Sequence, residues 1–146
     1  MKLKSILRGA GIAIPVLLIG IQLVPVSKTN PPVTKAIAWD SKQTQDLAQR
    51  ACMDCHSNTT VWPWYSNVAP VSWLLSSHVR NGRENMNFSE WTYSEKDKTK
   101  RAKKVEDEIS QGGMPDPSYL PMHSTARLTD AEKQQLIDGL KASILK

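Results

Sequence analysis

The sequence predicts an all-α protein, because apolar residues recur at helical spacing, helix caps precede these runs, and no segment shows the βαβ pattern of hydrophobic strands. The 146 residues are enough for one domain and an appendage. We expect a signal-anchor or transmembrane segment at residues 1–27, a Pro-rich linker at 28–38 and a helical domain at 39–146.

The N-terminal segment is typical of an export signal. Three basic residues come first: Lys2, Lys4 and Arg8. The uncharged stretch 9–26 follows, slightly shorter than the roughly 20 residues that a helix needs to cross a bilayer, and Pro15 interrupts it. The small residues of a cleavage site are poorly placed, since AIA at 36–38 lies too far beyond the stretch. We therefore expect a retained single-pass anchor in the bacterial inner membrane, with the domain on the periplasmic side.

The charge of the chain does not indicate a nucleic-acid surface. The net charge of +5 falls to +1 without residues 1–30, which hold four basic residues and no acid. The basic run at 96–104 continues with helical periodicity into acidic residues, as in a solvated helix face. We expect contact with a membrane through the N-terminal helix and none with nucleic acid.

The first two helices of the domain flank an aromatic, Pro-broken turn. Asp40 or Ser41 is expected to cap a helix over residues 42–55. Pro70 suits the first position of a second helix, which we expect to end near Gly82.

The last two helices have clear ends in the sequence. Ser94 caps a helix that Gly112 or Gly113 stops, and a capping box of Thr129 and Glu132 opens the final helix. The residues predicted to be buried are Ala102, Val105 and Ile109 in one helix and Leu136, Ile137, Leu140 and Ile144 in the other. Because these helices bury few aliphatic side chains, the domain needs a further stabilising element.

Both cysteines of the chain stand in the stretch ACMDCHSN, residues 51–58. C-x-x-C-H is the signature of c-type haem attachment. On one helical turn Cys52 and Cys55 share a face, so both sulfurs reach one edge of the porphyrin, and His56 then points its imidazole at the iron. A covalent haem would also supply the core that the helices lack. The tryptophans fit either packing around a flat ring or ordinary core packing: Trp39, Trp62, Trp64, Trp73 and Trp91.

Other chemistries use the same cysteine spacing. A thioredoxin-like pair needs strands around the motif, and a zinc site needs two more ligands, for which only His78 and His123 remain, each alone. A plain disulfide or two buried thiols is a further alternative. We favour haem attachment, because both the adjacent histidine and the preceding export signal belong to it.

Three blocks of the sequence carry a family resemblance: ACMDCHSNTTVWPWYSNVAPVSWLL, GRENMNFSEW and GGMPDPSYLPMHSTARLTDAEKQQLIDGL. They resemble the bacterial haem-binding domain family, a branch of c-type cytochrome-like proteins. The resemblance extends over about residues 39–140. It implies a cytochrome c-like helical domain around one covalent haem c on Cys52, Cys55 and His56, usually behind a membrane anchor. It implies no particular reaction.

Two functions suit a protein of this kind. The first is a mono-haem electron carrier or redox relay, in which both axial positions of the iron are filled and the redox partner is a protein of unknown identity. The second is a haem sensor or peroxidase-like enzyme with an open or displaceable distal ligand. We favour the carrier, because the sequence offers no convincing distal acid–base pair or nucleophile, and the enzymatic alternative stays open.

Met114 is the predicted distal ligand of the iron. Gly112 and Gly113 end a helix and let the backbone come close to a cofactor, and Pro115 turns Met114 out of helical geometry. His123, in the same loop, is the second candidate. The remaining candidates are Met122 and His78, with Met53 and Met86 less well placed.

Overall fold

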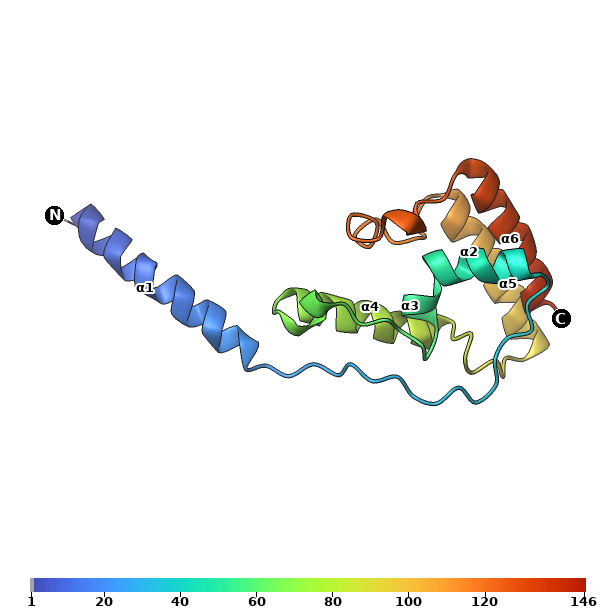
Figure 1. Cartoon of the computed structure of the whole chain (residues 1–146), viewed down its shortest axis with the longest axis horizontal. Helices are drawn as coiled ribbons and strands as arrows, with labels where there is room; N and C mark the ends of the chain where they lie inside the picture. The colour runs from blue at the N-terminus through green and yellow to red at the C-terminus, as the bar shows by residue number, and fades with distance from the viewer. Residues whose placement is uncertain (1) are drawn as a thin grey trace. The chain divides into compact units, whose positions relative to one another are not determined.

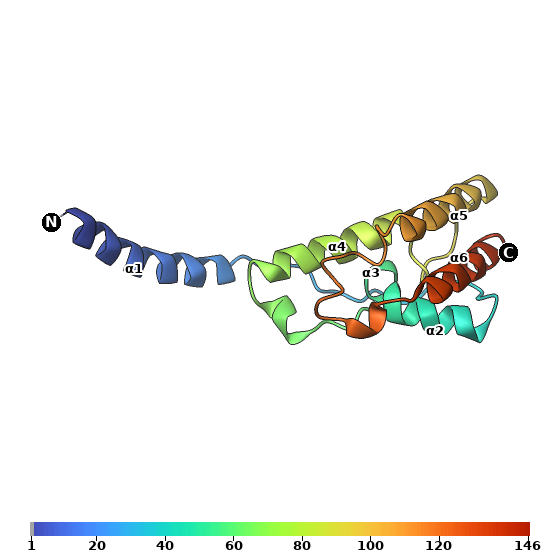
Figure 2. The same cartoon turned by 90° about the horizontal axis from the view of Figure 1, so that it is seen from above.

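The computed structural model describes residues 2–146, with side chains for residue 11 and from residue 13 onward. Its regular elements in this range are all helices, apart from one isolated bridge between Lys35 and Glu90, which confirms the predicted all-α class (Figures 1 and 2). The α-helices are α1 Lys2–Gln22, α2 Lys42–Ala51, α3 Met53–His56, α4 Val71–Asn85, α5 Glu95–Ser110 and α6 Asp130–Ile144, with 3-10 helices η1 Trp64–Asn67 and η2 Ser124–Ala126.

The chain divides into two compact units. The first unit consists of residues 1–29 and 61–78, and the second unit of residues 30–60 and 79–146. α4 begins in the first unit and ends in the second. The cysteine motif lies in the second unit, and so does the loop that carries Met114 and His123.

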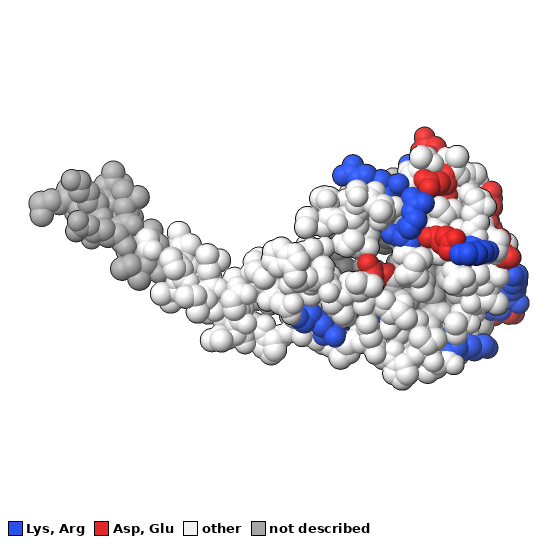
Figure 3. Space-filling view, in the orientation of Figure 1, with Lys and Arg blue, Asp and Glu red and all other residues white. Residues whose placement is uncertain are grey.

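α1 holds the predicted membrane anchor in the first unit. Met1 and the side chains of residues 2–10 and 12 of that prediction lie outside the described residues. Among the described residues, none of the helices combines the length and the apolar character that crossing a bilayer requires. The described part of α1 carries no charge in Figure 3, and its large apolar side chains are exposed, as with Leu17 at 65% and Ile19 at 68%.

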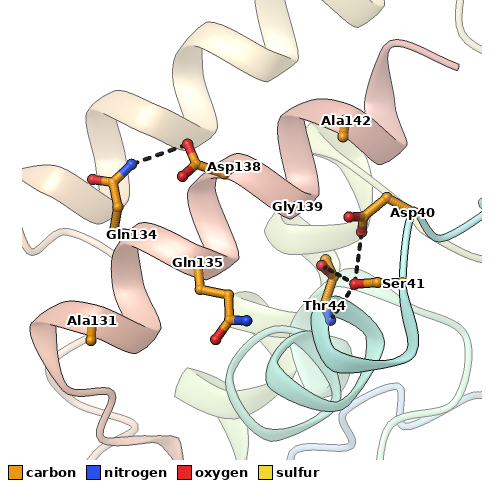
Figure 4. Close-up of a pocket in the computed structure, with 9 residues that line it drawn as sticks. All are labelled: Asp40, Ser41, Thr44, Ala131, Gln134, Gln135, Asp138, Gly139 and Ala142. Carbon is orange, nitrogen blue, oxygen red and sulfur yellow. Dashed lines mark hydrogen bonds between the residues drawn. The ribbon is translucent and has the colours of Figure 1, made fainter.

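α6 packs against both α5 and α2 and forms the core of the second unit. α2 and α6 cross closely, because a Cβ at Gly139 would overlap the Thr44 side chain (Figure 4). The Ser41 hydroxyl accepts from the Thr44 N–H at 3.2 Å, which confirms the predicted cap. The predicted buried residues of α5 and α6 are all buried.

The ends of α5 and α6 follow the sequence signals. The capping box between Thr129 and Glu132 is present at the start of α6. Past the end of α5, Gly112 has φ of +75°, and the N–H groups of Gly112 and Gly113 donate to the carbonyls of Ile109 and Glu108. This is the Schellman arrangement, in which a glycine takes the left-handed position.

Two helix boundaries differ from the prediction. The helix expected over 42–55 breaks at Cys52, whose φ is −129° and ψ is −38°, so the motif forms a separate turn, α3. The helix expected to end near Gly82 continues to Asn85. Glycine is tolerated inside α4 because a neighbouring backbone, that of Cys55, takes the space of its missing side chain.

The predicted linker belongs to the second unit from residue 30 onward. The N–H groups of Thr34 and Lys35 donate to the Ser89 carbonyl, and the N–H of Trp91 donates to the Lys35 carbonyl at 2.7 Å. Phe88, which is 2% exposed, lies at the centre of this region. The rings of Trp39 and Trp91 lie 5.2 and 6.1 Å from it. Trp91 is therefore a core residue, and Trp39 is partly buried and packs against the core.

Candidate functional site

The cysteine motif forms one tight turn between α2 and α4. The N–H of Cys52 still donates to Ala48 of α2 at 2.8 Å, while the carbonyl of Cys52 accepts from the N–H of His56 at 2.9 Å. Cys52 and Cys55 therefore stand three residues apart on a single turn, as the sequence predicted for two attachment points on one edge of a ring. Both carry free thiols.

Two backbone carbonyls, those of Met86 and Gly82, hydrogen-bond with the imidazole of His56. Its Nδ1 lies 3.0 Å from the carbonyl oxygen of Met86. A carbonyl can only accept, so Nδ1 carries the proton in its hydrogen bond to Met86. A ligating histidine typically donates its other N–H to a carbonyl or carboxylate, which fixes the ring orientation. Burial lowers the pKa of His56, which favours the neutral form that a metal binds.

The two thiols are held in their neutral form. Burial, with a smaller effect of Cys55, raises the pKa of Cys52 to about 12. Burial and the carboxylates of Asp54 and Asp116 raise the pKa of Cys55 to about 11, against an opposing effect of Arg83. Dithiol oxidoreductases need the opposite, a thiol whose pKa is lowered to between about 3.5 and 7.5. This electrostatic environment speaks against the thioredoxin-like alternative.

α4 passes directly beside the motif at Gly82. A Cβ on Gly82 would overlap the backbone carbonyl of Cys55. The next residue, Arg83, donates from Nε to the Ser57 carbonyl at 2.8 Å and from Nη2 to the Thr60 hydroxyl at 2.9 Å. Gly82 and Arg83 thus hold α4 against the cysteine motif and against residues 57–60, which follow the motif.

A buried polar network anchors the residues that follow the motif. The Asn58 side chain donates to Glu90 at 2.8 Å and accepts from Asn87 at 2.9 Å. The N–H of Phe88 donates to the His56 carbonyl at 2.8 Å. Asn58 and Asn87 are 3% and 5% exposed, so their hydrogen bonds are shielded from water. The backbone of His56 is therefore held by the same network that positions Met86.

The loop between α5 and α6 contacts the motif through Tyr119. Its hydroxyl donates to the Asp54 carboxylate at 2.6 Å. The His123 ring stacks on the Tyr119 ring at 3.7 Å between centroids, and its Nδ1 lies 3.0 Å from the Tyr119 carbonyl. His123 therefore resembles His56 in that its Nδ1 faces a backbone carbonyl.

The other candidates for the distal ligand of the iron differ in exposure and in the unit to which they belong. Met114 is 37% exposed and Met122 is 62% exposed, both in the loop that Tyr119 joins to the motif. His78 lies in the part of α4 that belongs to the first unit. Met86 is buried, and its carbonyl rather than its sulfur is the group that meets His56.

Sequence reasoning missed Gly82, the Met86 carbonyl and the Asn58–Asn87 pair as parts of the site. Gly82 was predicted only as a helix end, and a backbone carbonyl such as that of Met86 leaves no mark in a sequence. The adjacent asparagine was visible in ACMDCHSN, but its partner lies 29 residues further on.

Two observations from the rest of the described chain bear on the site. Within the described residues, no group of three or more His, Cys, Asp or Glu side chains could hold a metal ion by itself. An open depression between α2 and α6 is lined by polar and small residues, among them Gln134, Gln135 and Asp138 (Figure 4). None of the residues that line it is a cysteine or a histidine.

The chain matches the family described as the haem-binding domain over residues 16–142. This range is most of the chain and includes the whole motif. The chain belongs to the haem-binding domain family. Comparisons with curated proteins and with solved structures give no match. The expected family is thus confirmed, and the protein is a haem protein, while the roles of individual residues remain predictions.

Proposed function

We propose that this haem protein carries one haem c, attached through Cys52 and Cys55 with His56 as the proximal ligand, and that it transfers single electrons. The observation that supports this most is the His56 ring, whose Nδ1–H donates to the Met86 carbonyl, as the ring of a metal-ligating histidine typically does. Bound haem supplies a reversible one-electron couple at its iron.

The residues around the motif support a carrier because they hold it rigidly. His56 is fixed at its ring by Met86 and at its backbone by Phe88. Arg83 and the Asn58–Asn87 pair fix the residues that follow. A ligand that cannot shift keeps the same geometry in both oxidation states, so little rearrangement opposes electron transfer.

The second part of the proposal is a tether. We propose that α1 anchors the protein in the bacterial inner membrane, with the second unit in the periplasm. Its basic residues precede an apolar stretch, which favours a cytoplasmic N-terminus. The exposed apolar side chains of α1 support this, because a row of such side chains is unfavourable in water.

The test of attachment is a denaturing gel of protein matured with the cytochrome c machinery. We expect haem to migrate with the wild-type chain, and the double variant Cys52→Ala, Cys55→Ala to carry none. His56→Ala is the matched control, because it keeps both thiols and should retain covalent haem while losing the native spin state. Haem that separates from the wild-type chain under denaturing conditions contradicts covalent attachment.

Electron transfer is tested on the same sample by redox titration. We expect a single reversible one-electron wave in the wild type. Absence of a reversible wave, together with turnover of peroxide, would replace the carrier by the peroxidase-like alternative.

A further inference from the structure

The segment 61–78 of the first unit has a composition unlike the rest of the chain. It contains no Lys, Arg, Asp or Glu, in a protein in which 23% of residues are charged. It holds three of the five tryptophans: Trp62, Trp64 and Trp73. Uncharged stretches rich in tryptophan are typical of the boundary between lipid and water, where the indole ring has both apolar and polar contacts.

Several large apolar side chains of this segment face outward. Val61 is 70% exposed and Trp64 is 76% exposed. On α4, Val71 and Leu74 are 40% and 48% exposed, and their spacing of three places them on one side of the helix. With Val68, which is 43% exposed, these residues make up what we call the apolar face. Such an exposed set calls for a covering partner.

The segment that carries the apolar face belongs to the same unit as α1. It is hydrogen-bonded to the last residue of α1 and to the residues that follow this helix. The Gln22 side chain accepts from the Ala69 N–H at 2.9 Å and donates to the Ala69 carbonyl at 3.2 Å. The Ser76 hydroxyl donates to the Ser27 carbonyl at 2.8 Å. These bonds fix residues 69 and 76 against the end of the apolar stretch, where Leu23 is 82% exposed.

The first charge after the apolar stretch marks a polar boundary in this unit. Lys28 follows residues 9–26, and its ammonium group donates to the Asn67 side chain. Asn67 ends η1, which also carries Trp64. A lysine and a tryptophan at this level are the residues that commonly lie among lipid headgroups.

We propose that the apolar face rests in the headgroup region of the bilayer that holds α1, so that the first unit contacts the membrane twice. This inference rests on the tether of the proposed function. A lipid surface is the occupant that the structure favours, because the face is uncharged, contains tryptophan and is hydrogen-bonded to the end of α1. An interfacial segment of this kind binds by burying its apolar side chains at the edge of the acyl chains.

Site-specific photocrosslinking in the full-length holoprotein tests the proposal. The variants are Trp64→p-benzoylphenylalanine and Leu74→p-benzoylphenylalanine, each reconstituted into nanodiscs of phosphatidylcholine and phosphatidylglycerol. Leu145→p-benzoylphenylalanine is the matched control, because Leu145 is an apolar residue of the second unit with 50% exposure. Intact-mass spectrometry after irradiation identifies the adduct.

We expect lipid adducts at positions 64 and 74 to exceed those at position 145 several-fold. Equal lipid adducts at all three positions overturn the proposal, and so do adducts to a second copy of the chain or to the haem. A chain that does not enter the nanodiscs overturns both this inference and the tether. The haem spectrum of the same samples reports separately on the haem carrier, so the two failures are distinguishable.

Discussion

The two units differ in how completely they satisfy their own polar and apolar groups. In the second unit, the residues around the motif are linked by buried hydrogen bonds from Asn58, Asn87 and Arg83. Among the described residues, three buried polar atoms of the first unit have no partner, Trp62 Nε1, Ser66 Oγ and Trp73 Nε1, and in the second unit Arg101 Nε has none. Buried polar atoms are rarely left without a partner in a complete structure. The residues around the motif are thus paired more completely than the segment 61–78 of the first unit.

The two units also differ in the space around some of their glycines. A Cβ at Gly82 or Gly139 of the second unit would overlap a neighbouring element, while a Cβ at Gly20 of the first unit would meet nothing within 4 Å. Close backbone packing therefore belongs to the unit that carries the motif. This contrast allows the same substitution to be compared in both units.

The largest expected effect follows from Gly82→Ala. The added methyl group pushes α4 away from the carbonyl of Cys55, and such overpacking costs about 1–3 kcal/mol, more than the roughly 1 kcal/mol that alanine gains in helix propensity. Because Cys55 shifts with it, we also expect less covalently attached haem. Chemical denaturation followed by circular dichroism at the haem band measures the first effect, and a haem-stained gel measures the second.

Gly20→Ala is the matched control for Gly82→Ala. We expect it to leave haem attachment and the unfolding midpoint unchanged, because the new methyl group points into open space. If the two variants behave alike, close packing against α4 does not position the motif, and the contrast between the units is wrong.

The next effect is expected at the crossing of α2 and α6. Gly139→Ala places a methyl group on the buried Thr44 side chain, and we expect a loss of about 1–3 kcal/mol in the free energy of unfolding. Haem should remain attached, because the crossing does not touch α3. Adding Thr44→Ala makes room, so the double variant should recover part of the loss. Additive losses in this double-mutant cycle would contradict direct contact between the two positions.

The helices of the second unit were largely predictable because their signals are local. Ser41, Ser94 and Thr129 cap the helices that they were expected to cap, and Gly112 ends α5. The break at Cys52 was not predictable, because Leu47, Ala51 and Cys55 have the spacing of an unbroken helix. The turn that forms there contacts Gly82 and Met86, which are distant in the sequence. Local periodicity therefore carries no information about these contacts.

The sequence predicts the residue types of the candidate site, but it does not predict the groups that hold them in place. The C-x-x-C-H motif predicts three site residues at once, Cys52, Cys55 and His56, and the family match agrees with a haem protein. The groups that hold His56 are a backbone carbonyl and a backbone N–H, from Met86 and Phe88. Every residue has these groups, so only the fold determines which of them face the histidine.

A smaller effect on stability, with a clear spectroscopic change, is expected from Met114→Ala. If Met114 is the distal ligand, the variant loses the weak long-wavelength iron–sulfur absorption of the oxidised protein, has a lower reduction potential and binds carbon monoxide. Met122→Ala is the matched control in the same loop, with 62% exposure against 37% for Met114. A wild type that lacks this absorption and binds carbon monoxide readily excludes Met114. The haem sensor or enzyme would then be the better interpretation, and His123→Ala the next variant to measure.

The smallest expected effect is a pH dependence that only the second unit can show, since residues 1–29 and 61–78 contain no Asp or Glu. The Thr129 backbone N–H, the Arg50 side chain and the Thr129 hydroxyl lower the pKa of Glu132 from 4.5 to about 2, against an opposing effect of desolvation. A carboxyl whose pKa is lower in the folded state contributes stability above its unfolded pKa and loses it as the pH falls toward the folded one. Glu132 should therefore stabilise the second unit above pH 4.5 and progressively less between 4.5 and about 2. Glu132→Gln should flatten this part of the profile of unfolding free energy against pH, and Arg50→Met should flatten it partly, because the hydrogen bonds to Thr129 remain. An unchanged acid slope in Glu132→Gln would show that other carboxylates of the second unit dominate its acid unfolding.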